Sequence, residues 1–438
     1  MQVARIPVDT ENLTVGMYVA VLDRPWLETP FVFQGFVIKD RFEIEQLQSY
    51  CSQVFVDIDK GQLTEAQVRA LAEGKVTNSS LQRPVNGTAI KQPGFFGRLA
   101  LRLGLGALFS RRAEKGGNGY PITATARKEA PEARKAWDKA VFEYRHIFEK
   151  TKRVGSVDIN AVREVVQPLI DSIMRNPDAM AWTVFAGKRS DRNYSRAVAT
   201  AVWSIVFGRH LGFDRNTLLS LGVGGFLLDI GNVAIAREIL EAEGAITQDE
   251  YAQVPRHVQA GIDILSRSQG IDPVVSEMLT FHHERYDGSG YPTEANGSGI
   301  PIYGRIAAIV DCYDAMTTKN AYSPALAAYD AARELNDMRD EKFHGEVVEQ
   351  FLQAIGMFPT GSVVELSDGS ISLVLEQNRA NPLQPKLLVL KEKDGELLAR
   401  PRLMNPEHWP QGDQETPLWI AQGHEHGAFG IDPMKYFT

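Results

Sequence analysis

Hydrophobic residues change their spacing along the chain, and each spacing predicts a different kind of element. Residues 1–73 hold short β-branched and aromatic runs between turn residues, which predicts the strands of a small α+β domain. Similar runs return after residue 358 and predict a β-rich C-terminal extension over 359–438. The runs that favour strands are Tyr18–Leu22, Phe31–Ile38, Val54–Ile58, Ser362–Leu366, Ser370–Leu375 and Lys386–Lys391.

The central part of the chain follows a helical period instead. From residue 133 to 358 apolar residues recur three or four positions apart, and Val198, Val202 and Ile205 fall on one face of a helix. Sustained over this length, the pattern predicts a bundle of roughly eight or more helices. The fold class that we expect is therefore mainly α, with a small N-terminal α+β domain and a short C-terminal β appendage.

Residues 74–132 show neither period and are rich in Gly, Pro, Ser and Thr, which indicates a linker. The linker is basic, because 75–128 holds ten lysines and arginines against one acid, Glu114, in a chain of formal net charge −8. Its apolar and basic stretch 91–112 would suit peripheral contact with an anionic membrane surface. A solvated tether is the simpler alternative.

Composition limits the class of protein. With 438 residues, of which 44% are hydrophobic and 23% charged, the chain is long enough for two or three globular domains. Two cysteines argue against a disulfide framework, and the first residues do not resemble a signal segment, so we expect a cytoplasmic protein. No uncharged apolar run approaches the roughly 20 residues of a spanning helix. We expect neither a membrane crossing nor DNA as a partner.

The most informative motif runs from His282 to Pro292 and reads His-His-Glu-Arg-Tyr-Asp-Gly-Ser-Gly-Tyr-Pro. Adjacent imidazoles, a carboxylate and a glycine-containing turn are typical of the wall of a metal site. A pair of core or turn histidines that bind nothing is the simpler alternative.

The region 133–358 resembles the HD-GYP family, helical metal phosphohydrolases that open the bacterial second messenger cyclic di-GMP. The region before residue 74 is similar to the N-terminal domain often fused to this family. The resemblance implies an HD-type helical bundle with two or three metal ions that bind the phosphate and activate water. It rests on the segments 282–292, 256–257, 311–318 and 211–212.

Carried over onto this sequence, the resemblance implies one complete metal position. Its ligands are Asp229, His257, His282 and His283, whose three nitrogens and one oxygen suit iron, manganese or zinc. Asp311 belongs to the neighbouring ion in the family, and Asp229 and Asp311 would be the catalytic carboxylates if the protein is active. We therefore expect one divalent ion and no second.

The neighbouring position lacks its histidines. One falls on Leu228, and the other falls by helix spacing on Arg196, whose guanidinium repels a cation. A buried Asp229 would be costly unless a metal ion or Arg196 pairs with it, so we predict an Arg196–Asp229 ion pair as the metal-free arrangement. The family's phosphate-binding cations are replaced as well, by Asn232, Asn320 and Ser323.

These losses leave three hypotheses. The first is a cyclic di-GMP signalling protein with a degenerate centre, which acts by binding a nucleotide, a metal ion or another protein. The second is an active or weakly active metal-dependent cyclic di-GMP phosphodiesterase, and the third is a mononuclear metal sensor. In the family the loop of Asp287, Gly288, Gly290, Tyr291 and Pro292 docks partners, notably GGDEF domains, so we expect such a signalling partner. A glycine-permitted turn that ends the histidine helix is the plain alternative.

Overall fold

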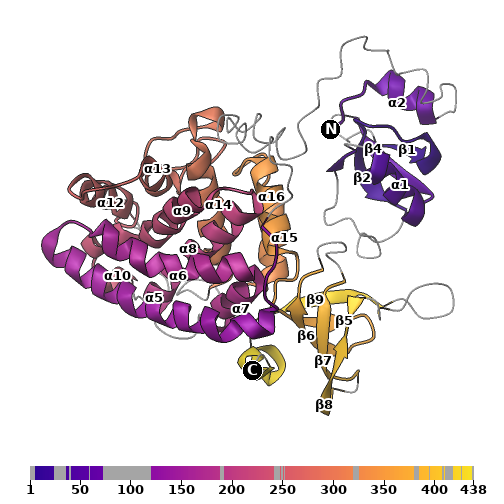
Figure 1. Ribbon diagram of the computed structural model, residues 1–438. Helices are drawn as coiled ribbons and strands as arrows, with labels where there is room; N and C mark the ends of the chain where they lie inside the picture. The colour runs from indigo at the N-terminus through magenta and orange to yellow at the C-terminus, as the bar shows by residue number, and fades with distance from the viewer. Residues whose placement is uncertain are drawn as a thin grey trace. The chain divides into compact units, whose positions relative to one another are not determined.

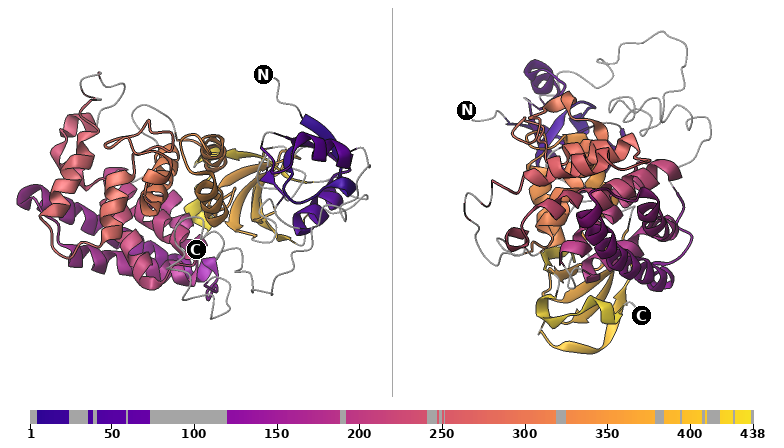
Figure 2. Two further views of the ribbon diagram at one scale, coloured as in Figure 1. Left: turned by 90° about the horizontal axis from the view of Figure 1, so that it is seen from above. Right: turned by 90° about the vertical axis from the view of Figure 1, so that its left-hand side faces the viewer.

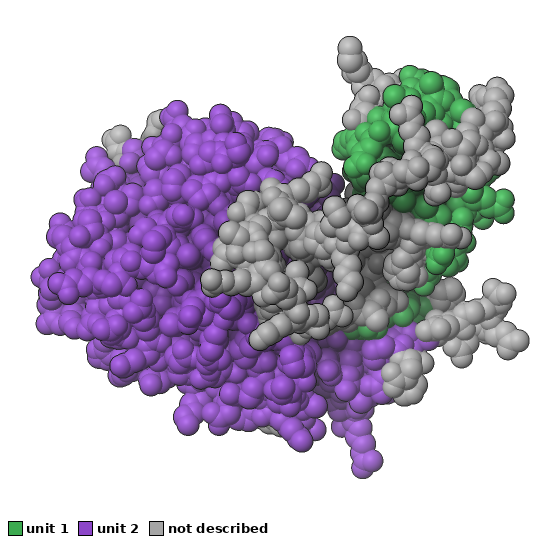
Figure 3. Space-filling model, turned by 45° about the horizontal axis from the view of Figure 1, so that its top comes forward, with its two compact units in different colours: residues 1–92, 378–384, 410–421 green, residues 93–377, 385–409, 422–438 purple. Residues whose placement is uncertain are grey.

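The chain divides into two compact units, which Figure 3 shows in different colours: residues 1–92, 378–384 and 410–421, and residues 93–377, 385–409 and 422–438. The stretch 91–112 and the positions Asn320 and Ser323, which carry predictions made above, lie outside the described residues. The computed structural model describes residues 5–23, 36–38, 41–58, 60–72, 120–187, 192–240, 247, 250, 252–318, 325–378, 384–393, 395–406, 409, 418–425 and 427–436.

The first unit has an α+β fold, with elements β1 Arg5–Asp9, β2 Tyr18–Leu22, β3 Phe36–Val37, α1 Arg41–Tyr50, β4 Gln53–Asp57 and α2 Glu65–Ala72 (Figure 1). Its strands form an antiparallel sheet in the order β1-β4-β2-β3. Alternate side chains of β1 and β4, such as Ile6, Val8, Val54 and Val56, enter one core because successive strand residues point to opposite faces. The predicted small N-terminal domain is confirmed.

The second unit is mainly helical, with α5 Ala126–Val154, α6 Ile159–Arg175, α7 Pro177–Gly187, α8 Arg192–His210, α9 Arg215–Leu227, η5 Ile230–Ala234, α10 Arg237–Leu240, α12 Arg256–Ser266, α13 Pro273–Phe281, α14 Ile302–Met316, α15 Ala328–Asp337 and α16 Gly345–Ile355. Helix α5 packs along α6, α7 and α8 (Figures 1 and 2). Helix α8 contacts α9, α14 and α16 in turn. In the interior Tyr313 meets Trp203 and Phe351 edge-to-face. The predicted helical bundle is confirmed.

Helix α5 begins at Ala126, earlier than the domain boundary predicted at residue 133. Thr125 caps its first turn. Glu129, which is buried, pairs with Arg175 of α6, with 2.7 Å between Oε2 and Nε. A segment whose own pattern is weak therefore joins the helix because a contact with another helix holds it there.

Helix α9 and the turn after it form a strongly apolar segment. By length and composition alone Arg215–Ala234 could cross a membrane. In the fold, 61% of its most apolar window is buried, and α9 packs against α6, α8 and α13. Its apolar character is that of a helix at the centre of a bundle.

A second sheet follows the bundle, with strands β5 Val363–Leu366, β6 Ile371–Glu376, β7 Lys386–Lys391, β8 Leu397–Met404 and β9 Ile420–His424 in the order β8-β7-β6-β5-β9. Strands β5, β6 and β7 lie at the predicted runs, and the β appendage is confirmed. Strand β8 was not predicted, because most of it is exposed and it lacks the alternation of buried and exposed residues.

Candidate metal centre

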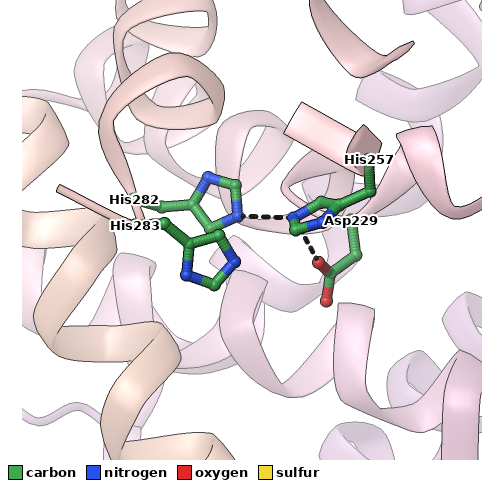
Figure 4. Close-up of side chains that lie close together, drawn as sticks. All are labelled: Asp229, His257, His282 and His283. Carbon is green, nitrogen blue, oxygen red and sulfur yellow. Dashed lines mark hydrogen bonds and ion pairs between the residues drawn. The ribbon is translucent and has the colours of Figure 1, made fainter. Parts of the chain in front are cut away.

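Residues from the ends of three helices meet in the second unit. Asp229 follows α9, His257 lies in the first turn of α12, and His282 and His283 follow α13. Each of the four offers one ligand atom, and these atoms lie within 4.8 Å of one another. Figure 4 shows the three imidazole rings and the carboxylate facing one another. The structure thus brings together the four residues predicted as ligands of the complete metal position.

The short helix η5 brings Asp229 to His257 by packing tightly on α12. A Cβ atom at Gly231 would lie 1.8 Å from the carbonyl oxygen of His257 and 2.6 Å from the backbone nitrogen of Gly261. Because these are backbone atoms of a helix, they cannot move aside for a side chain, and only glycine permits the approach. The carboxylate of Asp229 consequently lies 3.5 Å from Nε2 of His257.

Two hydrogen bonds fix the tautomers of His257 and His282. Their Nδ1 atoms lie 2.6 Å and 2.7 Å from the carbonyl oxygens of Val254 and Leu279. A carbonyl oxygen only accepts, so each Nδ1 carries the proton and donates it. In the neutral rings both Nε2 atoms are then acceptors, and they lie 3.2 Å apart. Two acceptors at this distance repel each other unless a proton or another cation lies between them.

Burial opposes a proton in that position. His282 is fully buried, and burial lowers its pKa below the ordinary value of histidine. The pKa of His283 is lowered further, first by burial and then by the neighbouring His282 and His257. Neutral imidazoles with converging lone pairs, beside a carboxylate, are the donor set of zinc, manganese and iron sites. The residues therefore fit a divalent metal ion.

The second oxygen of Asp229 faces Arg196 of α8. Nε of Arg196 lies 3.3 Å from Oδ2 of Asp229, an ion pair without hydrogen-bond geometry. Its Nη2 donates to Oδ1 of Asp311, on α14, at 2.5 Å. The predicted Arg196–Asp229 ion pair is confirmed. Asp311, which was predicted as a metal ligand, stands outside the four-residue cluster and binds the guanidinium instead.

Arg196 controls the ionisation of both carboxylates. Burial alone would raise the pKa of Asp229 and of Asp311, but the adjacent guanidinium, together with smaller contributions from neighbouring basic side chains, holds both pKa values below the ordinary range. Asp311, followed by Asp229, raises the pKa of Arg196 in return. All three groups are therefore charged at neutral pH.

The loop that leaves the histidines is held by Glu284, which is 1% exposed. Its carboxylate accepts hydrogen bonds from the backbone N–H and the hydroxyl of Thr293, both at 2.7 Å, and from the backbone N–H of Ala295 at 3.1 Å. Sequence analysis missed this role. Partners nine and eleven residues away in an irregular loop leave no local signal.

Tyr144 of α5 is a second residue near the site that sequence analysis missed. Its side chain is buried and packs edge-to-face on Phe226 of α9. Burial, and after it the charge of Asp229, raises the pKa of Tyr144. The sequence does not distinguish it from the other residues on the inner face of α5.

Two family models and several known proteins match this chain. Residues 183–347 match a family model described as an HD domain, and residues 5–162 match a domain of unknown function, DUF3391. A cyclic di-GMP phosphodiesterase of Pseudomonas aeruginosa is 27% identical over 387 residues, which cover 88% of this chain and 84% of that protein. A 3'3'-cGAMP-specific phosphodiesterase of Vibrio cholerae is 38% identical over 128 residues, which cover 29% of this chain and 24% of that protein.

The chain belongs to the HD-GYP family. It is also similar to a solved structure, an HDG"Y"P protein of Bdellovibrio bacteriovorus, at 12% identity and a TM-score of 0.38, with 80% of this chain and 98% of that chain covered.

Three of the positions at which this HD-GYP chain was predicted to depart from its family, Arg196, Leu228 and Asn232, lie around Asp229. Leu228 is buried at the C-terminal end of α9 and offers no donor atom. Asn232 is half-buried in η5, and its backbone N–H donates to the carbonyl oxygen of Asp229 at 2.9 Å. Where the family resemblance implies two histidines, the chain has the apolar Leu228 and the cationic Arg196. Where it implies a lysine, the chain has Asn232, whose side chain is polar and uncharged.

Proposed function

We propose that this HD-GYP protein is a cyclic dinucleotide signalling protein that binds its ligand at one divalent ion and Arg196 and has lost two-ion hydrolysis. The relatives named above are described as acting on cyclic di-GMP or on 3'3'-cGAMP, which supports a cyclic dinucleotide as ligand. The observation that carries the proposal is the guanidinium of Arg196 between Asp229 and Asp311.

Charge decides when an anion can enter this site. The carboxylates of Asp229 and Asp311 both form ion pairs with the same guanidinium, that of Arg196, so these three groups together carry an excess of negative charge. Without a further cation, this excess of negative charge repels a phosphodiester. A divalent ion held by Asp229 and the three histidines would supply two positive charges and Lewis-acid attraction for a phosphate oxygen. Binding of the dinucleotide should therefore require the metal.

Arg196 is placed to assist that binding. Its side chain is 31% exposed, and within the described part of the chain it contacts carboxylates through Nε and Nη2. Its Nη1 group is left for a phosphate oxygen, and guanidinium N–H groups suit that acceptor.

Arg196 cannot replace a second metal ion in hydrolysis, because a guanidinium is not a Lewis acid. In a two-ion centre, ions roughly 3.5–4 Å apart stabilise both the attacking and the departing oxygen. Losing about 4 kcal/mol of that stabilisation would slow the reaction about 10³-fold. The residual activity that the intact carboxylates Asp229 and Asp311 permit would then be far below that of a two-ion enzyme.

A mononuclear metal sensor is the second candidate function. The converging Nε2 atoms of His257 and His282 favour it, because this donor set needs no nucleotide to hold an ion. Cyclic di-GMP binding separates the two candidates, since a sensor would bind Mn(II) with the same affinity whether or not the dinucleotide is present.

The test combines metal analysis, calorimetry and product chromatography on the full chain. Wild-type protein should bind one Mn(II) and should bind cyclic di-GMP only when Mn(II) is present. It should form linear product far more slowly than a two-ion enzyme does. The double variant Arg196→His with Leu228→His should bind a second Mn(II) and gain hydrolysis.

Arg134→His is the matched control, because Arg134 also pairs with an aspartate, Asp138, but lies exposed on α5. It should leave metal content and binding unchanged. Rapid Mn(II)-dependent hydrolysis by the wild-type protein would overturn the proposal, as would cyclic di-GMP binding that is independent of the metal.

We also infer a partner surface at the loop Asp287–Pro292, in keeping with the GGDEF-type or other signalling partner expected from the family. Asp287 accepts hydrogen bonds from the backbone N–H and hydroxyl of Ser289 and pairs with Lys342 at 2.7 Å. These contacts support a defined loop conformation, which docking requires. Binding of a purified GGDEF domain, lost in a variant with Gly288 and Gly290 both changed to alanine, tests this.

A further inference from the structure

The loop Asp287–Pro292 returns to touch the metal centre through Tyr291. The ring of Tyr291 stacks on the ring of His283, with centroids 4.6 Å apart and planes 27° apart. Its backbone N–H donates to the carbonyl oxygen of His283 at 3.3 Å. The residue at the far end of the loop therefore contacts a predicted metal ligand at both its side chain and its backbone.

His283 differs from the other two histidines in what orients its ring. His257 and His282 each donate from Nδ1 to a backbone carbonyl oxygen. For His283, no hydrogen bond to either ring nitrogen occurs among the residues that the structure describes, and its ring contacts are with Tyr291 and the two histidines. Metal-binding histidines are normally oriented by a hydrogen bond from the second nitrogen. Here the stack on Tyr291 takes that place.

The loop is built so that Tyr291 cannot easily move away. A Cβ atom at Gly290 would lie 2.4 Å from the Cα of Glu284 and 2.5 Å from the carbonyl oxygen of His283, so the loop backbone packs directly on the histidine segment. Beyond Tyr291, the chain is fastened by the three hydrogen bonds that Thr293 and Ala295 donate to Glu284. Tyr291 is thus held between two fixed points.

We propose that Tyr291 is a positioning residue for His283, and that metal occupancy therefore controls the stability of the loop Asp287–Pro292. The inference rests on the metal site of the proposed function. A metal ion withdraws electron density from a coordinated imidazole, and a more positive ring is attracted more strongly to the face of a tyrosine. The metal strengthens the stack, and the stack must strengthen metal binding by the same factor, because the coupling of two equilibria is reciprocal.

The coupling has a functional consequence. The same loop is the surface inferred above to dock a signalling partner, so a metal-loaded centre would present a more ordered loop than an empty one. Metal occupancy of the centre would thereby affect the order of the docking surface without any hydrolysis.

The experiment uses Co(II) alone as the probe, on the full chain, with two readouts. Visible absorption follows Co(II) affinity and coordination, and hydrogen exchange of peptides covering residues 286–296 follows the loop. In the wild-type protein Co(II) should slow exchange in this segment. Tyr291→Ala should weaken Co(II) binding about three- to tenfold and remove the effect of Co(II) on loop exchange.

Two further variants separate positioning from a general loss of structure. Tyr291→Phe keeps the ring and should behave as the wild type in both readouts. Tyr286→Ala removes another ring from the same segment. The ring of Tyr286 contacts His344, which is not one of the predicted metal ligands, so this variant should leave Co(II) affinity unchanged. Circular dichroism of all variants checks that the helices are intact.

The outcomes distinguish this inference from the proposed function. If the wild type binds Co(II) but its loop exchange does not respond, or if Tyr291→Ala binds Co(II) as the wild type does, the inference is wrong and the metal site stands. If the wild type binds no Co(II), the proposed metal site fails and the inference fails with it.

Discussion

Arg196→Ala should destabilise the helical bundle, because it leaves two carboxylates without the cation that compensates them. Removing one partner of a buried ion pair costs about 3–5 kcal/mol. The side chains of Arg196 and Asp229 are 31% and 19% exposed, so solvent screens their contact, whereas Asp311 is only 5% exposed. We therefore expect a loss of about 2–3 kcal/mol at pH 7, most of it from Asp311.

Unfolding in urea, followed by tryptophan fluorescence, measures this loss. Trp203 lies fully buried in α8, the helix that carries Arg196, and reports on the right unit. A loss of this size should lower the melting temperature of the bundle by about 5–10 °C. Saturating Mn(II) should recover part of it, because binding to the native state stabilises that state.

The loss of stability in Arg196→Ala should depend on pH in a defined direction. In the wild type the pKa values of Asp229 and Asp311 are lower in the folded state than in the unfolded state, because Arg196 lies beside them. Their contribution to the stability of the fold is therefore present above the ordinary aspartate pKa and is lost as the pH falls through the lowered values. Without Arg196, burial raises both pKa values, and the carboxylates take up protons on acidification. The deficit of Arg196→Ala should thus be largest near pH 7 and shrink below about pH 5.

The control is Arg134→Ala, which breaks an exposed pair with Asp138 and should change stability by less than about 0.5 kcal/mol. A deficit of that small size for Arg196→Ala, or a deficit that grows on acidification, would refute the reasoning that the guanidinium compensates the two acids.

Three further predictions concern other residues in and around the candidate metal centre. Gly231→Ala should separate η5 from α12 and abolish Mn(II) binding in metal analysis. Gly299→Ala is the control and should keep its Mn(II), because a Cβ atom added there meets nothing within 4 Å. Equal metal contents in the two variants would contradict this prediction. Glu284→Gln should lower the free energy of unfolding by about 1–3 kcal/mol in urea, and an unchanged midpoint would exclude the anchoring role. The metal-free protein should lose stability as the pH falls from about 7 to 5, because unfolded His282 and His283 take up protons that the folded rings, with lowered pKa values, do not. In His283→Gln the stability should depend less steeply on pH, and a steeper dependence would count against the assignment.

Much of the site was predictable because its parts lie on regular elements with a recognisable motif. The period of the apolar residues indicated a helix around position 198, and the motif at His282 supplied two ligands. The family resemblance, carried over by helix spacing, placed Arg196 opposite Asp229, because residues on one helix face keep their direction over many turns. The ion pair between them confirms that reasoning.

Other contacts belong to the tertiary structure alone. Asp311 was predicted as a metal ligand from the family resemblance, whereas its hydrogen bond from Arg196, which α8 brings near it, is visible only in the structure. Glu284 and Tyr291 gain their roles from a loop that folds back over the histidines, and α5 begins early because of a partner on α6. By itself, the sequence determined the kinds of element, the donor set and the charge at each position. Which charge neutralises which, and which ring orients which ligand, depends on distances between segments far apart in the chain, and only packing sets those distances.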